Sequence, residues 1–545
     1  MTRAVVLALG CALSVSAIGC TRIDVGSGSR TGRHGYTIPH TLRLGEPTEY
    51  GSLNPHLDAR VAGIAALTMA WLLRSGSDDR PVPELATAVP TQSNGGISRD
   101  GRTITYHLRH DAMWSDGAPF TADDVLFSTR TVLDPHTNEA TRFFFDDIAR
   151  VSAPDKYRVV LTLKHPYAGA VFAYFYSGGS ICILPAHVLA HLPNINTAPY
   201  NSMPVGIGPF TYARWDRGNQ IVLAANPRYF RGRPKLDRII FKLYPNFITT
   251  YGALRAHTID LAPWYASVSD GVEKDREFFV LQRSEFGLSY FILNLRRPPF
   301  DDIAVRRAVR LAIDRKRIQQ IFLAGSPATT DATYPLTETV YPMGHPMYAA
   351  MPVVPHDPVA ANRILDDHGW RRGADGVRVK NGRPLEITIP VEAGWRGTDQ
   401  LQEILRAELH DIGAVADTRY FASALMESPQ SPVMLGNFDL NPTTFQLDAY
   451  GDLSTIFGCA GGPPDGWNRG GYCNPALDRL LAAFNATYDE SARRKVAYRI
   501  QRTIYDDVPV ISSVSDAQDW IMNTDLHGFN PNRTTPYDDF MKVDI

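Results

Sequence analysis

Two hydrophobic periods alternate irregularly along this chain, and this alternation limits the possible folds more than any other feature of the sequence. Apolar residues recur at every second position in some segments, as in half-buried strands, and at helical spacing in others. The strand-like segments include 104–108, 159–163 and 239–243, and the helix-like segments include 305–312, 401–412 and 477–504. The mixture, with no short-period repeat, predicts an α/β or α+β protein.

Capping residues mark where several of these helices begin and end. Thr121 and Asp124 form a capping box before an apolar run, and Asp301 and Asp302 precede the stripe at 305–312. Gly413 follows the stripe at 401–412, and glycine readily adopts the left-handed conformation that ends a helix. We expect these apolar stripes to face the core.

The composition describes a large, nearly neutral globular protein. The chain has 545 residues, of which 44% are hydrophobic, so it can build large cores. Its 55 Lys and Arg residues are balanced by 57 Asp and Glu residues, for a net charge of −2. Nucleic-acid-binding proteins normally carry a basic excess or stripe, so this balance argues against that class of partner.

The first twenty residues predict export. Arg3 precedes an apolar stretch at 4–18, which is too short to span a bilayer and lies where a secretory signal belongs. The sequence AIGC at 17–20 resembles the lipobox of bacterial lipoproteins, with Ala17 where the motif prefers Leu. We expect Cys20 to be acylated; the alternative is an ordinary signal peptide with an incidental cysteine. Residues 21–36 then form a flexible Gly/Ser-rich tether.

Three further cysteines follow, and two of them bracket a loop. Cys459 and Cys473 flank a stretch too rich in Gly and Pro for regular structure, and an exported protein meets an oxidising compartment. We therefore expect a disulfide between them, with Cys182 free and buried. A zinc site is the competing interpretation, but no Cys-x-x-Cys or paired His accompanies these residues.

The common catalytic motifs are missing from the sequence. It contains no P-loop, no Gly-x-Ser-x-Gly elbow, no His-Glu-x-x-His and no strand followed by Gly-x-Gly-x-x-Gly. His187 and His191 share a helix face, but no third metal ligand is nearby, so we expect solvated or packed side chains. We expect no enzyme activity, no cofactor and no metal.

Ordered motifs carry a family resemblance. The most specific is MWSDGAPFTADDV at 113–125; the others are PELA at 83–86, VGIGPF at 205–210, NPRYFRGRP at 226–234, Asn294 with PF at 299–300, VRRA at 305–308, AIDR at 312–315, GYCNP at 471–475 and VPV at 508–510. Together they resemble the family 5 extracellular solute-binding proteins of ABC importers, which bind peptides, oligopeptides and nickel. The matches run from about residue 40 to the C-terminus.

The resemblance implies an α/β, bilobal periplasmic-binding-protein fold of type II (cluster C), a Venus flytrap with a small inserted domain. Closure of the cleft between the lobes would enclose the ligand. The expected boundaries are 1–20 for the signal peptide, 21–36 for the tether, 37–75, 196–285 and 513–545 for the first lobe, 76–195 for the inserted domain, and 286–512 for the second lobe.

The resemblance also implies binding without chemistry. Family members hand their solute to a membrane permease that a separate ATPase drives. We therefore expect a monomer, lipid-anchored in the periplasm or at the cell surface, that captures short peptides. Within the family a nickel complex, haem, an oligosaccharide or an opine are alternative ligands, although the absence of His from 430–475 disfavours nickel. A peptide sensor without transport and a hydrolase are alternatives from other classes.

Seven residues are candidates for the ligand site. Peptide-binding relatives hold the ligand's amino terminus with an acidic residue shortly after a Trp. Here Asn437 replaces that Trp, Asp439 is the closest acidic match and Asp448 the second; either carboxylate can instead cap a turn. The remaining candidates are aromatic or basic residues on segments that the resemblance places near the cleft or hinge: Trp264, Phe286, Tyr290, Trp395 and Arg396. Ordinary packing is the alternative for each.

Overall fold

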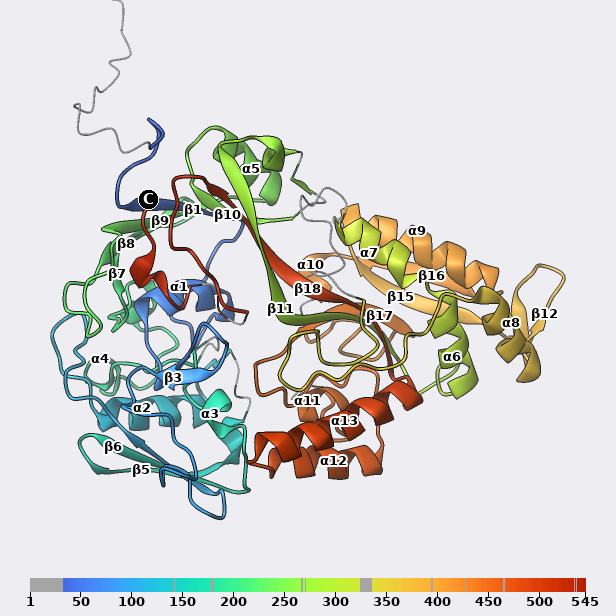
Figure 1. The fold of residues 1–545 in the computed structure, drawn as a ribbon, viewed down its shortest axis with the longest axis horizontal. Helices are drawn as coiled ribbons and strands as arrows, with labels where there is room; N and C mark the ends of the chain where they lie inside the picture. The colour runs from blue at the N-terminus through green and yellow to red at the C-terminus, as the bar shows by residue number, and fades with distance from the viewer. Residues whose placement is uncertain are drawn as a thin grey trace, which may run out of the picture. The chain divides into compact units, whose positions relative to one another are not determined.

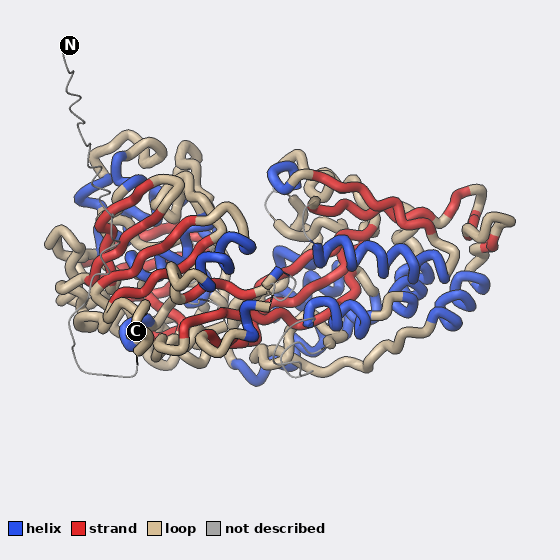
Figure 2. The backbone as a smooth tube through the Cα atoms, turned by 90° about the horizontal axis from the view of Figure 1, so that it is seen from above, coloured by secondary structure: helices blue, strands red, loops and turns tan. Residues whose placement is uncertain are grey.

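Two long antiparallel strands connect the two halves of the fold. Strands β11 (Phe278–Leu293) and β18 (Val510–Asn523) pair from Phe278 beside Asn523 to Ile292 beside Val510. Figures 1 and 2 show both strands passing from one group of elements into the other. The register of this pairing shifts on both sides of Leu288, an irregularity of the kind that lets paired strands bend.

This computed structural model describes residues 33–140, 142, 144–177, 181–265, 268–269, 271–323, 336–393, 396–426, 428–463, 466–533, 535 and 537–545. Residues 38–545 form one compact unit, and the following description concerns that unit.

The first lobe is the half built on the parallel pairing of β1 with its two neighbours. Beyond β18, the sheet continues in the order β10 (Leu261–Trp264), β1 (Thr41–Glu46), β9 (Arg238–Leu243), β8 (Gln220–Ala225) and β7 (Phe210–Asp216). Helices α1 (Ala62–Thr68) and α5 (Phe247–Arg255) also belong to this lobe. Alternate strand residues such as Leu42 and Leu44 are fully buried, and the last residue, Ile545, lies in the same core.

Several elements outside the eight-stranded sheet follow α1 in the chain. They are β2 (Leu73–Ser75), β3 (Pro81–Pro83), β4 (Thr103–His107), α2 (Ala122–Leu133), β5 (Ile148–Asp155), β6 (Arg158–Leu163), α3 (Ala170–Ala173) and α4 (Ala186–Leu189). The motif at 113–125 lies here in a structural role. Trp114 is completely buried, and Asp116 accepts a hydrogen bond from the amide of Ala118 and contacts His187 at 2.8 Å.

The second lobe is the half that carries the parallel pair β15 (Glu386–Glu392) and β16 (Val415–Phe421). Strand β17 (Leu440–Gln446) pairs with the C-terminal part of β11 and so extends the eight-stranded sheet into this lobe. The remaining elements are α6 (Ile303–Ala312), α7 (Arg315–Leu323), α8 (Pro358–Asp367), β12 (Arg371–Arg372), β13 (Arg378–Lys380), β14 (Arg383–Pro384), α9 (Arg396–Asp411), α10 (Ser423–Met426), α11 (Ser454–Phe457), α12 (Pro475–Asn485) and α13 (Glu490–Asp507).

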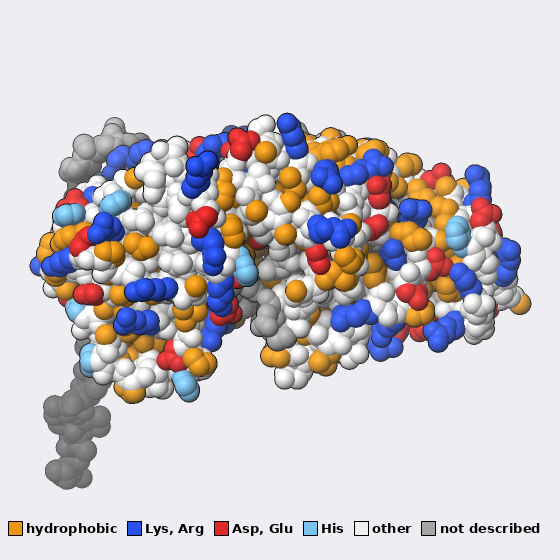
Figure 3. All heavy atoms as spheres, turned by 90° about the horizontal axis from the view of Figure 1, so that it is seen from below, with side chains coloured by type: hydrophobic (Ala, Val, Ile, Leu, Met, Phe, Trp, Pro, Cys, Tyr) orange, Lys and Arg blue, Asp and Glu red, His pale blue; other side chains and the backbone are white. Residues whose placement is uncertain are grey.

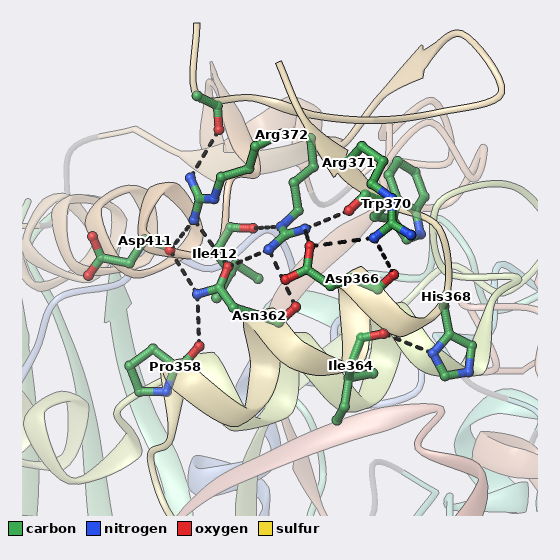
Figure 4. A network of polar contacts seen from close by, with 12 residues as sticks. Pro358, Asn362, Ile364, Asp366, His368, Trp370, Arg371, Arg372, Asp411 and Ile412 are labelled. Carbon is green, nitrogen blue, oxygen red and sulfur yellow. Dashed lines mark hydrogen bonds and ion pairs between the residues drawn. The ribbon is translucent and has the colours of Figure 1, made fainter. Parts of the chain in front are cut away.

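Hydrogen bonds from the buried Arg378 tie the three-stranded sheet β12–β14 to helix α8 and to the end of α9; Figure 4 labels their acceptor residues Asn362, Asp366 and Ile412. Arg378 is 2% exposed, and its guanidinium donates to the carbonyls of Ile412 (2.9 Å) and Trp370 (2.5 Å). It also donates to the carboxylate of Asp366 (2.6 Å) and to the side-chain oxygen of Asn362 (2.8 Å). Because these acceptors satisfy the N–H donors of the guanidinium, the charged group can stay buried.

The predicted elements are confirmed where caps and periodicity mark them. The three strand-like segments are β4, β6 and β9, and the helical stripes are α6, α9, α12 and α13. Helix α2 begins at the predicted capping box, in which Thr121 and Asp124 both bond to the backbone. Gly413, just past α9, has a positive φ of 76°.

Charges of both signs are interspersed over the face shown in Figure 3, as the near-zero net charge leads one to expect. Among the described residues, no helix is both long enough and apolar enough to cross a bilayer. The described ranges also contain no cluster of three or more His, Cys, Asp or Glu side chains placed to hold a metal ion.

Candidate ligand-binding site

The second lobe contains a cavity of about 670 Å³ beside the sheet. This size falls within the range of small-molecule sites. Below it is called the main cavity. Its lining residues are mostly apolar or uncharged: Ser289, Tyr290, Phe291, Ile318, Pro390, Val391, Glu392, Thr398, Leu401, Gln402, Met426, Ser428, Pro429, Val433, Met434, Asn441, Pro442, Thr443, Thr444, Trp467, Arg469 and Ser513.

Strand pairing brings the polar part of this lining together. Strands β11 and β17 run antiparallel with Ser289 beside Thr444 and Tyr290 beside Thr443. The hydroxyls of Ser289 and Thr444 lie 3.1 Å apart. The end of β15 and the first turns of α9 supply further lining residues, including Glu392 and Gln402. Most of the lining therefore comes from regular elements, which hold it in place.

Of the predicted aromatic residues, Tyr290 lines the main cavity. It is 2% exposed, and its hydroxyl donates to the carbonyl of Val340 at 3.0 Å. Phe286, four residues earlier on β11, does not line the cavity; its ring meets that of His345 edge to face at 4.8 Å. Trp264 ends β10 in the first lobe and is buried in a separate apolar cluster. The proposed ligand roles of Phe286 and Trp264 stay predictions.

Asp439 lies immediately before β17 and already has partners. Its carboxylate accepts from Arg297 (Nε to Oδ1, 3.0 Å) and from the backbone amide of Thr388 (2.8 Å). The amide of Asp439 in turn donates to the carbonyl of Thr388, so this residue joins β15 to the start of β17. It does not line the main cavity, and its role as a ligand anchor stays a prediction.

Asp448 lies in the turn after β17. Its Oδ1 accepts from the amides of Tyr450 (3.0 Å) and Gly451 (2.8 Å), the arrangement of a turn-capping carboxylate. Burial, reinforced by the nearby Asp452 carboxylate, raises the pKa of Asp448 to about 6. Asp448 does not line the main cavity either, so its proposed role in ligand binding also stays a prediction.

Three predicted functional residues fall wholly or partly outside the described structure. Cys20 and Trp395 lie outside the described residues. For Arg396, which begins α9, the structure describes only the backbone. Their roles in lipid attachment and ligand binding stay predictions.

The predicted disulfide is present in the structure. Cys459 and Cys473 are bonded, with their Cα atoms 4.4 Å apart, and Cys182 is free and buried as expected. The segment that they close, here called the disulfide loop (459–473), brings Trp467 and Arg469 to the main cavity.

These two residues were not among the sequence candidates. The sequence predicts a covalent constraint for this loop, and a Trp and an Arg within an irregular, disulfide-closed loop are a signal that could also indicate a binding site. Glu392 was missed as well, because nothing in a strand sequence reveals which neighbouring elements its end will face.

A smaller cavity of about 480 Å³ shares Pro390 with the main cavity. It contains two arginines, and each is paired with a carboxylate of the chain. Arg297 binds Asp439, and Arg419 binds Asp417. The lining residues are Arg297, Thr388, Pro390, Arg419, Phe421, Leu425, Gln430, Pro432, Leu435 and Asn437.

Two α/β lobes joined by paired strands, with a lined cavity in one lobe, define a bilobal ligand-binding protein. The chain belongs to the bacterial extracellular solute-binding proteins, family 5, whose sequence profile matches residues 80–462. This confirms the resemblance and, with the structural matches below, the predicted bilobal α/β fold. Members of this family are transport binding proteins and not enzymes, so the protein serves in substrate binding.

Several known proteins are similar to this chain. Protein XP55 of Streptomyces lividans is 28% identical over 87% of this chain and 83% of its own length. The oligopeptide-binding protein AppA of Bacillus subtilis is 26% identical over 86% of this chain and 84% of its own.

The solved structures share the fold. A structure of AppA from Bacillus subtilis with a nonapeptide covers 92% of this chain and 98% of its own, at 22% identity and a TM-score of 0.77. NikZ of Campylobacter jejuni with Ni(L-His) covers 93% of this chain and 99% of its own, at 23% identity and a TM-score of 0.78.

Proposed function

We propose that this protein captures short peptides outside the cytoplasm and delivers them to the permease of an ABC importer. The observation that carries this proposal is the main cavity, a mostly uncharged chamber beside the strands that join the two lobes. The peptide class is supported by the relatives, since AppA is described as oligopeptide-binding and was solved with a nonapeptide.

The lining suits a ligand that is recognised through its backbone. Thr443, Thr444 and Asn441 offer hydroxyl and amide groups along β17, which can bond to peptide groups whatever the ligand's side chains are. Val391, Leu401 and the other apolar residues form walls that accept side chains of several shapes. Such a division of labour is what a receptor for many peptides needs.

A metal complex suits this lining less well. No His or Cys is among the described residues that line the main cavity, and these are the side chains that transition metals prefer. We therefore propose a peptide for this chain, and not a nickel complex like the Ni(L-His) bound by NikZ.

The proposed delivery of peptide to the permease involves the two lobes, the strands between them and the N-terminal tether. We propose that residues 37–75, 196–285 and 513–545 form one lobe, that 286–512 form the other, and that 76–195 form the inserted domain. Closure would bend β11 and β18, where each crosses between the lobes. Acylated Cys20 and the tether at 21–36 would keep the receptor near its permease and ATPase.

Native mass spectrometry tests this function directly. The exported protein with Cys20 replaced by Ala is purified without denaturation, and released adducts are sequenced. We expect a ladder of adducts that fragment as short peptides. A single bound mass that is not a peptide would overturn the peptide proposal and identify another ligand class.

A further inference from the structure

Hydrogen bonds of Asn468 position the backbone beside the cavity-facing residues of the disulfide loop. Asn468 is 5% exposed, and its side-chain nitrogen donates to the carbonyls of Gly458 (2.9 Å) and Tyr472 (2.6 Å). Its side-chain oxygen accepts from the amide of Tyr472 at 3.0 Å. The two residues beside Asn468 in sequence are Trp467 and Arg469, so both start from a fixed backbone.

Close backbone approaches also fix the loop against β11. A Cβ on Gly470 would lie 2.3 Å from the carbonyl oxygen of Leu293, so no other residue fits there without movement. The carbonyl of Gly470 accepts from the amide of Leu295 at 2.9 Å. The loop therefore packs directly against β11, the strand that also supplies Tyr290 to the main cavity.

Arg469 brings a positive charge to the main cavity, and no described carboxylate neutralises it. Its side chain is half-buried, its Nε is enclosed without a hydrogen-bond partner, and no described carboxylate lies within ion-pair distance. Its guanidinium lies 4.5 Å from the ring centre of Trp467, a cation–π contact. Desolvation lowers the pKa of Arg469, but a guanidinium remains charged at neutral pH.

The arginines of the smaller cavity differ from Arg469 in this respect. There, Arg297 and Arg419 each contact an aspartate of the chain. In the main cavity, Glu392 is the only described carboxylate in the lining, and it forms no ion pair with Arg469. A half-buried charge without a partner is costly unless a ligand supplies the opposite charge.

We propose that Arg469, stacked on Trp467 and fixed by the disulfide loop, is the anion-binding group of the main cavity and holds a carboxylate of the bound ligand. This inference rests on the proposed peptide function and adds that the bound peptide presents a carboxylate to Arg469. The carboxylate can be the peptide's C-terminus or an Asp or Glu side chain, and both present the planar pair of oxygens that a guanidinium matches.

Two random pentapeptide libraries distinguish these sources. One has free C-termini and the other has C-terminal amides; the protein is incubated with each, and retained peptides are identified by mass spectrometry. We expect the free-acid library to be retained at least about tenfold better than amidated members lacking Asp and Glu. Amidated members that contain Asp or Glu are retained if the side chain is the source of the carboxylate.

Variants assign the selection to Arg469. Arg469→Gln removes the charge and should lose the preference for carboxylates, whereas Arg469→Lys keeps the charge and part of the preference. Arg502→Gln is the matched control: Arg502 pairs with Asp506 on the exposed face of α13 and should select as the wild type does. Near-ultraviolet circular dichroism verifies that each variant is folded.

The outcomes separate the two proposals. Equal retention of free-acid peptides and of amidated peptides lacking Asp and Glu would overturn the role of Arg469 and leave the peptide function standing. Unchanged selection by Arg469→Gln would do the same. If no peptide from either library is retained, the proposed peptide-binding function is wrong, and so is the proposed binding of a peptide carboxylate by Arg469.

Discussion

Residue by residue, the acidic candidates show how context decides the role of a carboxylate. Asp439 and Asp448 lie in the segment where the family resemblance placed an amino-terminus anchor, and the residue type alone allowed that role. The structure gives Asp439 an arginine and a backbone amide, and it gives Asp448 two backbone amides. These partners come from strand pairing and turn geometry that the sequence does not reveal, so a sequence can propose such residues but cannot rank them.

Replacing Asp448 by Asn separates a structural role from a ligand role. Its raised pKa means that the folded state releases this proton at about pH 6, whereas the unfolded chain releases it near pH 3.8. The carboxylate therefore costs stability as the pH rises from 4 to 7. Asn keeps an oxygen for the amides of Tyr450 and Gly451. We expect Asp448→Asn to match the wild type at pH 4 and to exceed its free energy of unfolding by roughly 1–3 kcal/mol at pH 7.

Urea unfolding at the two pH values measures this difference. Asp367→Asn, at the exposed end of α8, is the control and should change the free energy of unfolding by no more than about 0.5 kcal/mol at either pH. A loss of stability on replacing Asp448, or a loss of peptide binding with unchanged stability, would contradict the structural role.

Among the elements, the helices were the most predictable part of the fold. Thr121 and Asp124 predict the start of α2, and Gly413 predicts the end of α9, because capping residues and apolar stripes reflect interactions within a few residues. The main cavity was not predictable in this way. It depends on the register that places Tyr290 beside Thr443, residues far apart in sequence, and on a loop that the disulfide folds back onto β11.

The disulfide loop should contribute measurably to stability. The disulfide joins residues 14 positions apart and so lowers the conformational entropy of the unfolded chain. We therefore expect the double substitution Cys459→Ser, Cys473→Ser to lower the free energy of unfolding by roughly 3 kcal/mol. Differential scanning calorimetry with and without a reducing agent provides the control. Reductant should lower the melting temperature of the wild type toward that of the variant and leave the variant unchanged; an equal shift in both proteins would contradict the assignment.

The three-stranded sheet β12–β14 should depend on Arg378 for its attachment to α8 and α9. Truncation to Ala leaves the carbonyls of Ile412 and Trp370 without their donor. We therefore expect Arg378→Ala to lower the free energy of unfolding by roughly 3 kcal/mol. Arg383→Ala is the matched control: Arg383 is exposed on β14 of the same small sheet, and its truncation should lower the free energy of unfolding by less than about 1 kcal/mol. Urea unfolding measures both variants. Equal effects would mean that the hydrogen bonds of Arg378 do not stabilise this part of the fold.

For the whole molecule, the ordered motifs carried more information than the composition. Near-neutral charge and a large apolar fraction describe many proteins, whereas the sequence of motifs from about residue 40 onward identified a family that the profile match confirms. Fold class and binding role follow from that family. The position of the cavity within the second lobe, and the two charges that line it, required the structure.

Photo-crosslinking tests the central claim most directly, because it reports ligand class and location together. Pentapeptides that carry p-benzoylphenylalanine are bound and irradiated, and labelled residues are mapped by mass spectrometry, a chemistry that favours methionine side chains. We expect label on Met426 or Met434, which line the main cavity, and its loss when unlabelled peptide competes. Met113 and Met203 are exposed outside the second lobe and should stay unlabelled. Label confined to those two residues, or none that competes, would contradict peptide binding in this cavity.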